Sequence, residues 1–223
     1  MPKNNLGDPG GPALKQQETV CTIAAADLKS GEFGIAVASS SLAVGKNVPF
    51  TRAHVGAIAV QGYASPFFGI AGMKLLREGT HSQAVIESVM AGDPLKEHRQ
   101  MLVVDVTGKP AVFTGSEVSP FCGSHEGENY AVAGCGLAGQ AVIEACAKAF
   151  EETSADLAGR LVAALAAAQN SSGDSAPFES AAVRISKDNP YPYLDLRIDR
   201  HADPVTELAR LLEIWRTKTA ATA

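Results

Sequence analysis

The chain has 223 residues, of which 46% are hydrophobic and 19% charged, and its formal net charge is −5 at pH 7. This length allows one well-cored domain of ordinary globular composition, and nothing requires a second. The mildly acidic balance argues against a nucleic-acid partner, because nucleic-acid-binding proteins normally carry a basic patch or stripe. No window reaches the roughly 18 consecutive apolar residues that predict a membrane-spanning helix, so no membrane partner is expected.

Residues 1–18 are polar, rich in glycine and proline, and lack the apolar core of a secretory signal. We expect a flexible leader there, followed by one domain over residues 19–219. The four cysteines include no CxxC pair and have no disulfide-like density. These features favour a cytoplasmic protein with reduced thiols.

The first predicted structure is a buried hairpin. Two apolar runs, Val20–Ala26 and Phe33–Ser40, flank Lys29-Ser30-Gly31, which has the small polar and glycine residues that a chain reversal needs. Apolar residues run through both strands with little alternation. We therefore expect both faces of the sheet that contains them to be covered.

Strand runs and helix runs follow in turn along the rest of the chain. Further strands are predicted at Val55–Gln61, Met101–Asp105, Ala111–Thr114, Ser180–Ile185 and Tyr193–Asp199. Helices are predicted at Gly69–Arg77, Ser82–Met90, Gln140–Glu151, Ser154–Ala168 and from Asp203-Pro204 through Trp215, with Ser82 and Asp203-Pro204 as caps. The glycine-rich passage from Pro120 to Gly139 carries no strand prediction. This order favours a four-layer αββα sandwich with mostly antiparallel sheets.

Cys21-Thr22, at the start of the first strand, is the sharpest chemical signal. Hydrolases with an N-terminal nucleophile place Cys, Ser or Thr at the start of a strand in such a fold, and the freed α-amine serves as base because its pKa is about 8. Cys21 and Thr22 are therefore candidate nucleophiles. The alternative is that a small apolar cysteine and a β-favouring threonine simply fill a strand.

Polar residues elsewhere are weaker candidates. Ser39 and Ser40 offer hydroxyls at the end of the second strand, and Asp174 in a glycine-serine loop could orient a base or a substrate amine. A polar strand end and a surface carboxylate are the alternative interpretations. The histidines share no HxH or HExxH spacing, and no metal or organic cofactor is indicated.

Several segments together resemble the bacterial family DUF1028, which is grouped with the N-terminal-nucleophile hydrolase-like proteins. They are GIAVASSSLAVG, VGAIAVQ, FTGSE, AGCGLAG, GDSAPFESAA and LDLRIDRHADPVTEL, and the resemblance covers about Val20 to Glu213. It implies an αββα sandwich and, by analogy, hydrolysis of an amide or similar bond. It also suggests that substrate-binding residues lie in these segments, for which we select Ser40, Gln61, Cys135 and Glu179.

The chain departs from the family pattern at its first strand. Members usually have Thr-Phe-Ser where Val20-Cys21-Thr22 stands, so the threonine is replaced by valine and only Thr22 keeps a hydroxyl in register. Members also tend to have Asn at Cys135 and Gln at Glu179. A terminal nucleophile here further requires the removal of about twenty residues, because the leader precedes Cys21.

Two functional hypotheses follow. The first is a hydrolase of a C–N bond in a small molecule or short peptide, with Cys21 or Thr22 attacking, a donor near Ser39 and Ser40 holding the oxyanion, and Asp174 orienting the site. The second is a non-catalytic ligand-binding or assembly protein on the same fold. Under either hypothesis we expect a homodimer, because closed twofold symmetry is the commonest arrangement.

Overall fold

The computed structural model of the protein describes residues 18–118, 121–173 and 175–220. Within these residues the strands form a six-stranded sheet in the order β10-β9-β2-β1-β8-β7, here sheet A, and a four-stranded sheet in the order β3-β4-β5-β6, here sheet B. Sheet A consists of β1 Val20–Asp27, β2 Glu32–Ser39, β7 Cys122–Gly127, β8 Tyr130–Cys135, β9 Ser180–Ser186 and β10 Leu194–Ile198. Sheet B consists of β3 Pro49–Arg52, β4 Gly56–Gly62, β5 Arg99–Asp105 and β6 Pro110–Thr114.

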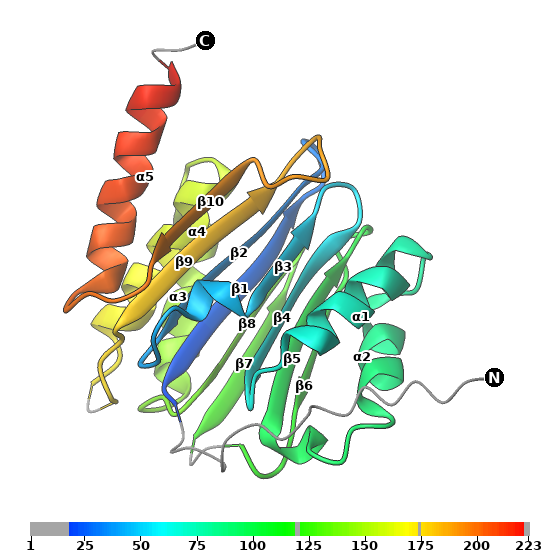
Figure 1. Cartoon of the computed structure of the whole chain (residues 1–223). Coiled ribbons are helices and arrows are strands. Elements are labelled where there is room, and N and C mark those ends of the chain that lie inside the picture. Colours follow the sequence, from blue (N-terminus) through cyan, green and yellow to red (C-terminus); the bar gives the residue numbers. More distant parts are fainter. Residues whose placement is uncertain (1–17, 119–120, 174, 221–223) are drawn as a thin grey trace.

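The two sheets lie face to face between two helical layers (Figure 1). Sheet B is covered by α1 and α2, and sheet A by α3, α4 and α5. These helices span α1 Pro66–Arg77, α2 Ser82–Met90, α3 Gln140–Glu152, α4 Leu157–Asn170 and α5 Pro204–Ala220. All strand pairs described in both sheets are antiparallel. The predicted four-layer αββα sandwich is confirmed.

The opening hairpin is the centre of sheet A. Its strands β1 and β2 pair from Val20 with Ser39 to Asp27 with Glu32, and the side chains alternate between two apolar cores. Ile23 points to the helical layer, whereas Ala24 and Phe33 point to sheet B. Burial of a side chain such as Ile23 or Phe33 stabilises the fold by about 1.5–3 kcal/mol. Both faces of the hairpin are covered, as its continuous apolar runs predict.

The passage from Pro120 to Gly139 is not a simple loop, because it contains the β7–β8 hairpin. Glycines weaken a strand in isolation, but β8 pairs on one side with β7 and on the other with the central strand β1. This tertiary pairing outweighs the low strand propensity. The sequence also missed the short strand β3, which begins at Pro49 on the edge of sheet B, where proline is tolerated.

The predicted N-terminal cap of α2 is wrong, whereas that of α5 is correct. Ser82 is the first residue of α2, and the cap position is occupied by His81. The Ser82 N–H donates to Asp105 Oδ2 at 3.1 Å, so a carboxylate from the end of β5 takes the place of a side-chain cap. At α5, Asp203 Oδ1 accepts the Thr206 N–H at 3.3 Å, and the predicted cap is confirmed there.

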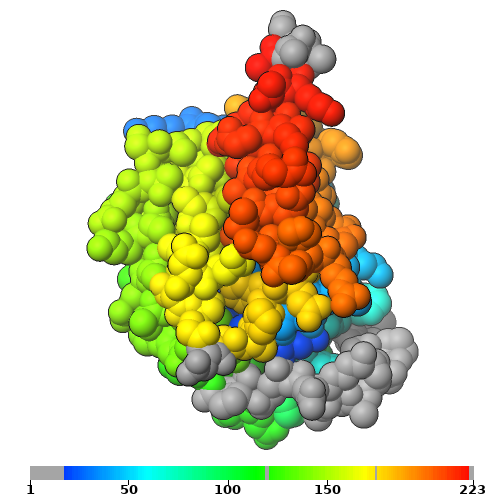
Figure 2. All heavy atoms as spheres, turned by 90° about the vertical axis from the view of Figure 1, so that its left-hand side faces the viewer, coloured from blue at the N-terminus to red at the C-terminus, as the bar shows by residue number. Residues whose placement is uncertain are grey.

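Helix α5 packs on α4, β9 and β10, and its last turn extends past the rest of the molecule (Figure 2). Val205, Leu208 and Leu212 are buried toward sheet A, while residues 217–220 are exposed. Tyr193 and Trp215 meet edge to face at 5.3 Å between ring centroids. None of the helices in the described part of the chain is long and apolar enough to cross a membrane.

Candidate functional site

Five strands of sheet A bring one row of side chains to the same end of the sandwich. Val20 pairs with Cys135 and with Ser39, Cys135 pairs with Cys122, and Ser39 pairs with Ser180. Alternation places this row on the face that looks toward sheet B. We call it the edge row; its members are Cys122, Cys135, Val20, Ser39 and Ser180. Four of the five carry a thiol or a hydroxyl, so small polar groups gather where the two sheets end.

Two residues further along β1, Thr22 connects the two sheets through buried amides. The Thr22 hydroxyl donates to Gln61 Oε1 on β4. Gln61 Nε2 donates to Gln100 Oε1 on β5 at 2.6 Å and to the Ala133 carbonyl at 3.2 Å. We call Thr22, Gln61 and Gln100 the amide relay. All of them are at most 1% exposed.

The amide relay is fully satisfied at its far end as well. Gln100 Nε2 donates to Thr114 Oγ1 at 2.9 Å and to the Gly123 carbonyl at 3.3 Å. Cys135 Sγ donates to Gln100 Oε1 at 3.2 Å, which joins the relay to the edge row. Because an unpaired buried amide costs about 1–3 kcal/mol, this network fixes the rotamers of its members. The Thr22 hydroxyl is therefore held in one orientation between the sheets.

Cys122 and Cys135 differ in their acidity. A side-chain hydrogen bond with Cys135 and a backbone hydrogen bond with Gly136 lower the pKa of the Cys122 thiol against the opposing effect of burial. The pKa of Cys135 is raised well above its usual value, first by that same hydrogen bond and then by burial. Cys122 is half-buried and Cys135 is 1% exposed. Cys122 is thus the more reactive thiol of the two.

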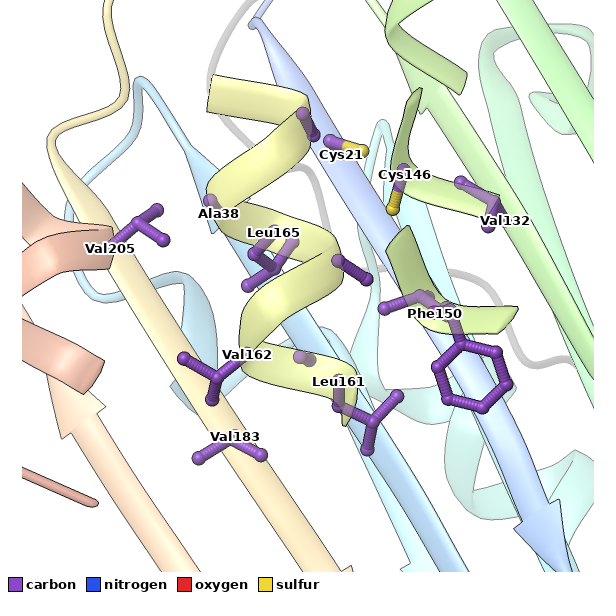
Figure 3. Packing of buried hydrophobic residues seen from close by; sticks show 14 of the residues in the cluster. Cys21, Ala38, Val132, Cys146, Phe150, Leu161, Val162, Leu165, Val183 and Val205 are labelled. Atoms are coloured by element: carbon purple, nitrogen blue, oxygen red, sulfur yellow. The ribbon is translucent and has the colours of Figure 1, made fainter. Parts of the chain in front are cut away.

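Cys21 lies on the opposite face of β1 from Thr22, because successive side chains of a strand alternate. It is 0% exposed and its side chain points to Cys146 of α3 in the helix–sheet core (Figure 3). A hydrogen bond with Cys21 and complete burial raise the pKa of the Cys146 thiol. The structure therefore separates the two predicted nucleophiles, and only Thr22 faces the edge row and the amide relay.

Ser39 and Ser40 bond to backbone groups at the strand ends. Ser39 Oγ accepts the Ser41 N–H at 3.0 Å, and Ser40 Oγ accepts the Thr19 N–H at 3.0 Å. The Thr19 hydroxyl in turn donates to the Gly136 carbonyl at 3.1 Å, where the chain leaves β8 with a positive φ of 67°. These bonds tie the start of β1 to the ends of β2 and β8. Ser39 is 1% exposed, and Ser40 is half-buried.

Glu179 and the loop before it approach the same end. The Glu179 N–H donates to the Ser39 carbonyl at 2.8 Å, and its carboxylate lies 3.8 Å from Arg200 Nε. Asp174 lies outside the described residues. Close by in sequence, Ser175 Oγ is a buried oxygen without a hydrogen-bond partner among the described residues. Such an atom is available to a ligand.

Sequence reasoning missed Cys122 and Gln100 as members of this site. Cys122 lies in the glycine-rich passage from Pro120 to Gly139, which carries no strand prediction, and Gln100 comes just before the predicted strand at Met101–Asp105. A longer strand prediction would have placed Gln100 in a strand, but only the packing of sheet B on sheet A brings it to Gln61 and Cys135. The described residues contain no group of three or more His, Cys, Asp or Glu side chains arranged to hold a metal ion.

Two antiparallel sheets packed between helical layers, with β1 at the centre of sheet A, define a four-layer αββα fold. The chain belongs to DUF1028, a family of unknown function whose model matches residues 21–208. It is similar to the crystal structure of protein SPO2555 from Silicibacter pomeroyi, also of DUF1028, with 32% identity over 87% of this chain and 85% of that chain and a TM-score of 0.82. The family resemblance seen in the sequence is confirmed.

Two more distant structures are also similar. HslV from Trypanosoma brucei is 11% identical over 75% of this chain and 99% of that chain, with a TM-score of 0.47. Anbu (ancestral beta-subunit) from Yersinia bercovieri is 11% identical over 92% of this chain and 98% of that chain, with a TM-score of 0.42. At these TM-scores the likeness does not bear on function. No curated protein matches the chain.

Proposed function

We propose that this protein is a hydrolase of a C–N, amide-type bond in a small molecule or short peptide, with Thr22 as its nucleophile. The observation that supports this best is the direction of the Thr22 hydroxyl, which lies between the sheets and is oriented by Gln61. Cys21, the other candidate nucleophile, points into the helix–sheet core instead. The residues assigned to substrate binding are Ser40, Gln61, Cys135 and Glu179.

The reaction is an acyl transfer to the threonine oxygen. Thr22 Oγ attacks the carbonyl carbon, and a hydroxyl or N–H near Ser39 and Ser40 stabilises the oxyanion. The C–N bond then breaks, the amine leaves with the proton from Thr22, and water cleaves the acyl-threonine ester. Gln61 Oε1 orients the hydroxyl but is too weak a base to accept its proton. Asp174 keeps the predicted role of orienting the substrate amine.

The position of Thr22 inside β1 sets two conditions on this mechanism. Its strand pairs on both sides, with Val37 and with Ala133. In our proposal its hydroxyl acts within this intact strand and not as the first residue of a cleaved chain. Thr22 is also 0% exposed, so a substrate reaches it only when the edge row moves apart. Intact mass of the active protein tests the first condition: an active chain that begins at Cys21 or Thr22 would contradict it.

The test of the nucleophile uses two nearly isosteric variants. Thr22→Ser keeps the hydroxyl and Thr22→Val removes it, while Cys21→Ala serves as a control on the opposite face of the same strand. Release of amine from a panel of N-acyl amino acids and dipeptides is measured with an amine-reactive fluorophore. We expect Thr22→Val to lose all turnover, and Thr22→Ser and Cys21→Ala to stay within about tenfold of the parent rate. Unchanged turnover in a folded Thr22→Val protein refutes the assignment.

A non-catalytic ligand-binding or assembly protein is the second candidate. It is favoured by Val20, which occupies the centre of the edge row where members of the family usually carry threonine, and which has no nucleophilic atom. A thermal-shift screen with the same panel separates the two functions. A compound that raises the melting temperature and is recovered unchanged after incubation supports binding alone.

Two further expectations are part of the proposal. A homodimer is expected on grounds of symmetry, and light scattering after size exclusion tests it: a monomer mass at micromolar concentration would contradict it. A cytoplasmic location is supported by the cysteines, none of which forms a disulfide in the structure. Fractionation of the source cells checks the location.

A further inference from the structure

Cys122 and Cys135 stand directly opposite each other on the antiparallel strands β7 and β8. The neighbouring Gly136 N–H donates to the Phe121 carbonyl at 2.8 Å, so Phe121 and Gly136 form a hydrogen-bonded pair. Since the two kinds of pair alternate along an antiparallel ladder, Cys122 and Cys135 form a non-hydrogen-bonded pair, whose Cα atoms lie about 4.5 Å apart. This separation falls within the range of about 4.4–6.8 Å that disulfides span.

Both thiols point the same way and already touch. Each belongs to the core between the sheets, and their side chains are hydrogen-bonded to each other. We propose that Cys122 and Cys135 form a reversible cross-strand disulfide by exchange with a low-molecular-weight disulfide of the glutathione type. The site modified is the cysteine end of the edge row. This inference is independent of the proposed hydrolysis.

The two cysteines have different roles in the exchange. Cys122 attacks first, because it is the more exposed thiol and its pKa is lowered. Its thiolate displaces one thiolate from the small disulfide and forms a mixed disulfide. Cys135 then attacks the Cys122 sulfur and expels the second small thiolate, and its proton goes to a released thiolate. Two protein thiols and one small disulfide thus become one protein disulfide and two small thiols.

Formation of the mixed disulfide also prepares Cys135 for its step. The largest cause of the raised pKa of Cys135 is its hydrogen bond to Cys122, and the Cys122 charge adds to it. Once the Cys122 sulfur is bonded to another sulfur, both of these effects are lost. Cys135 then ionises more readily beside the bond that it attacks.

The resulting bond is expected to be easily reduced. Side chains of a cross-strand pair have Cβ atoms about 4.5–5.5 Å apart, whereas a disulfide holds them at about 3.5–4.5 Å. The strands must therefore approach each other, and strained disulfides are the labile ones. Oxidation also removes the S–H that Cys135 donates to Gln100 Oε1. The amide relay therefore has one hydrogen bond fewer when the two cysteines are oxidised.

The chain contains a matched control in Cys21 and Cys146. These thiols also lie next to each other, but both are 0% exposed, between sheet A and α3 (Figure 3). An exchange reaction that depends only on sulfur proximity would link either pair. A reaction that needs an accessible attacking thiol links only Cys122 and Cys135.

The folded protein is incubated with oxidised glutathione at pH 7.5 and then acid-quenched, and thiols are counted in denaturant before and after dithiothreitol. Peptides are mapped without reduction. We expect the thiols to fall from four to two, a Cys122–Cys135 linkage, and recovery of all four on reduction. The Cys135→Ser variant should retain glutathione on Cys122, and the Cys21→Ala/Cys146→Ala variant should form the same linkage as the parent. Four unreacted thiols, a Cys21–Cys146 linkage, or a glutathione adduct without the internal bond would overturn the proposal.

Discussion

The buried ion pair between Asp93 and Arg99 holds the start of β5 in place, beside the amide relay. The side chains are 4% and 1% exposed, and Arg99 Nε lies 2.5 Å from Asp93 Oδ2. Arg99 also donates to the Tyr63 carbonyl and stacks 4.3 Å from the centroid of the Phe68 ring. The next residue along β5 is Gln100. Loss of this pair should therefore destabilise the protein and loosen the strand that supplies the relay.

The substitution that isolates the charge is Asp93→Asn. Asparagine keeps an oxygen for the Leu95 N–H, which Asp93 Oδ1 accepts at 3.1 Å, but leaves Arg99 without a counter-charge. Breaking a buried pair in this way costs about 3–5 kcal/mol, and the remaining contacts of Arg99 favour the lower limit. For a domain of this size, about 3 kcal/mol lowers the melting temperature by about 6–12 °C.

Urea denaturation at pH 7, followed by far-ultraviolet circular dichroism, measures this loss. Fluorescence of Trp215 would report mainly on α5, which lies on the other side of the sandwich. The control is the double variant Asp93→Leu/Arg99→Met, which removes both charges and should recover most of the lost stability. A loss below about 1 kcal/mol in Asp93→Asn, or a double variant that is no more stable than the single one, would show that the pair is not what holds β5.

Three further predictions test the packing around the site. Burial raises the pKa of Asp105, but its hydrogen bonds outweigh burial and lower the pKa overall. The contribution of the carboxylate to stability is therefore complete above about pH 4 and is lost as the pH falls through the folded pKa. Asp105→Asn should cost about 1.5–3 kcal/mol of stability at pH 7 in urea melts, and the stability difference from the parent should shrink under acid conditions. Gln61→Met leaves the buried Thr22 hydroxyl without its acceptor, so it should cost about 1–3 kcal/mol and, on the hydrolase proposal, lower turnover. Val20→Thr should cost less than Val104→Thr in the apolar part of the same layer, because only the edge row offers polar partners; equal losses in thermal melts would count against a polar edge.

The sequence predicted the strands and helices where burial follows from local composition. Val20–Asp27 and Glu32–Ser39 were recognisable because their apolar runs are continuous, and α5 because Asp203-Pro204 begins it. The β7–β8 hairpin was not, since its glycines argue against a strand and only the pairing of β8 with β1 stabilises it. The candidate site depends on such pairings. No local pattern relates Gln61 to Gln100, or Cys122 to Cys135.

The register of sheet A places two departures from the expected family pattern next to each other. Val20 and Cys135 are the positions where the resemblance to the family leads one to expect threonine and asparagine. They pair directly with each other, and Cys135 pairs with Cys122. In the edge row, β1 thus carries an apolar side chain, and the next two strands carry thiols. Cys21, the sharpest chemical signal of the first strand, is not part of this row, because the alternation of side chains along the strand turns it toward Cys146. The reactive side chains that are particular to this chain therefore lie on the next two strands after β1 in sheet A. They are Cys135 on β8 and Cys122 on β7.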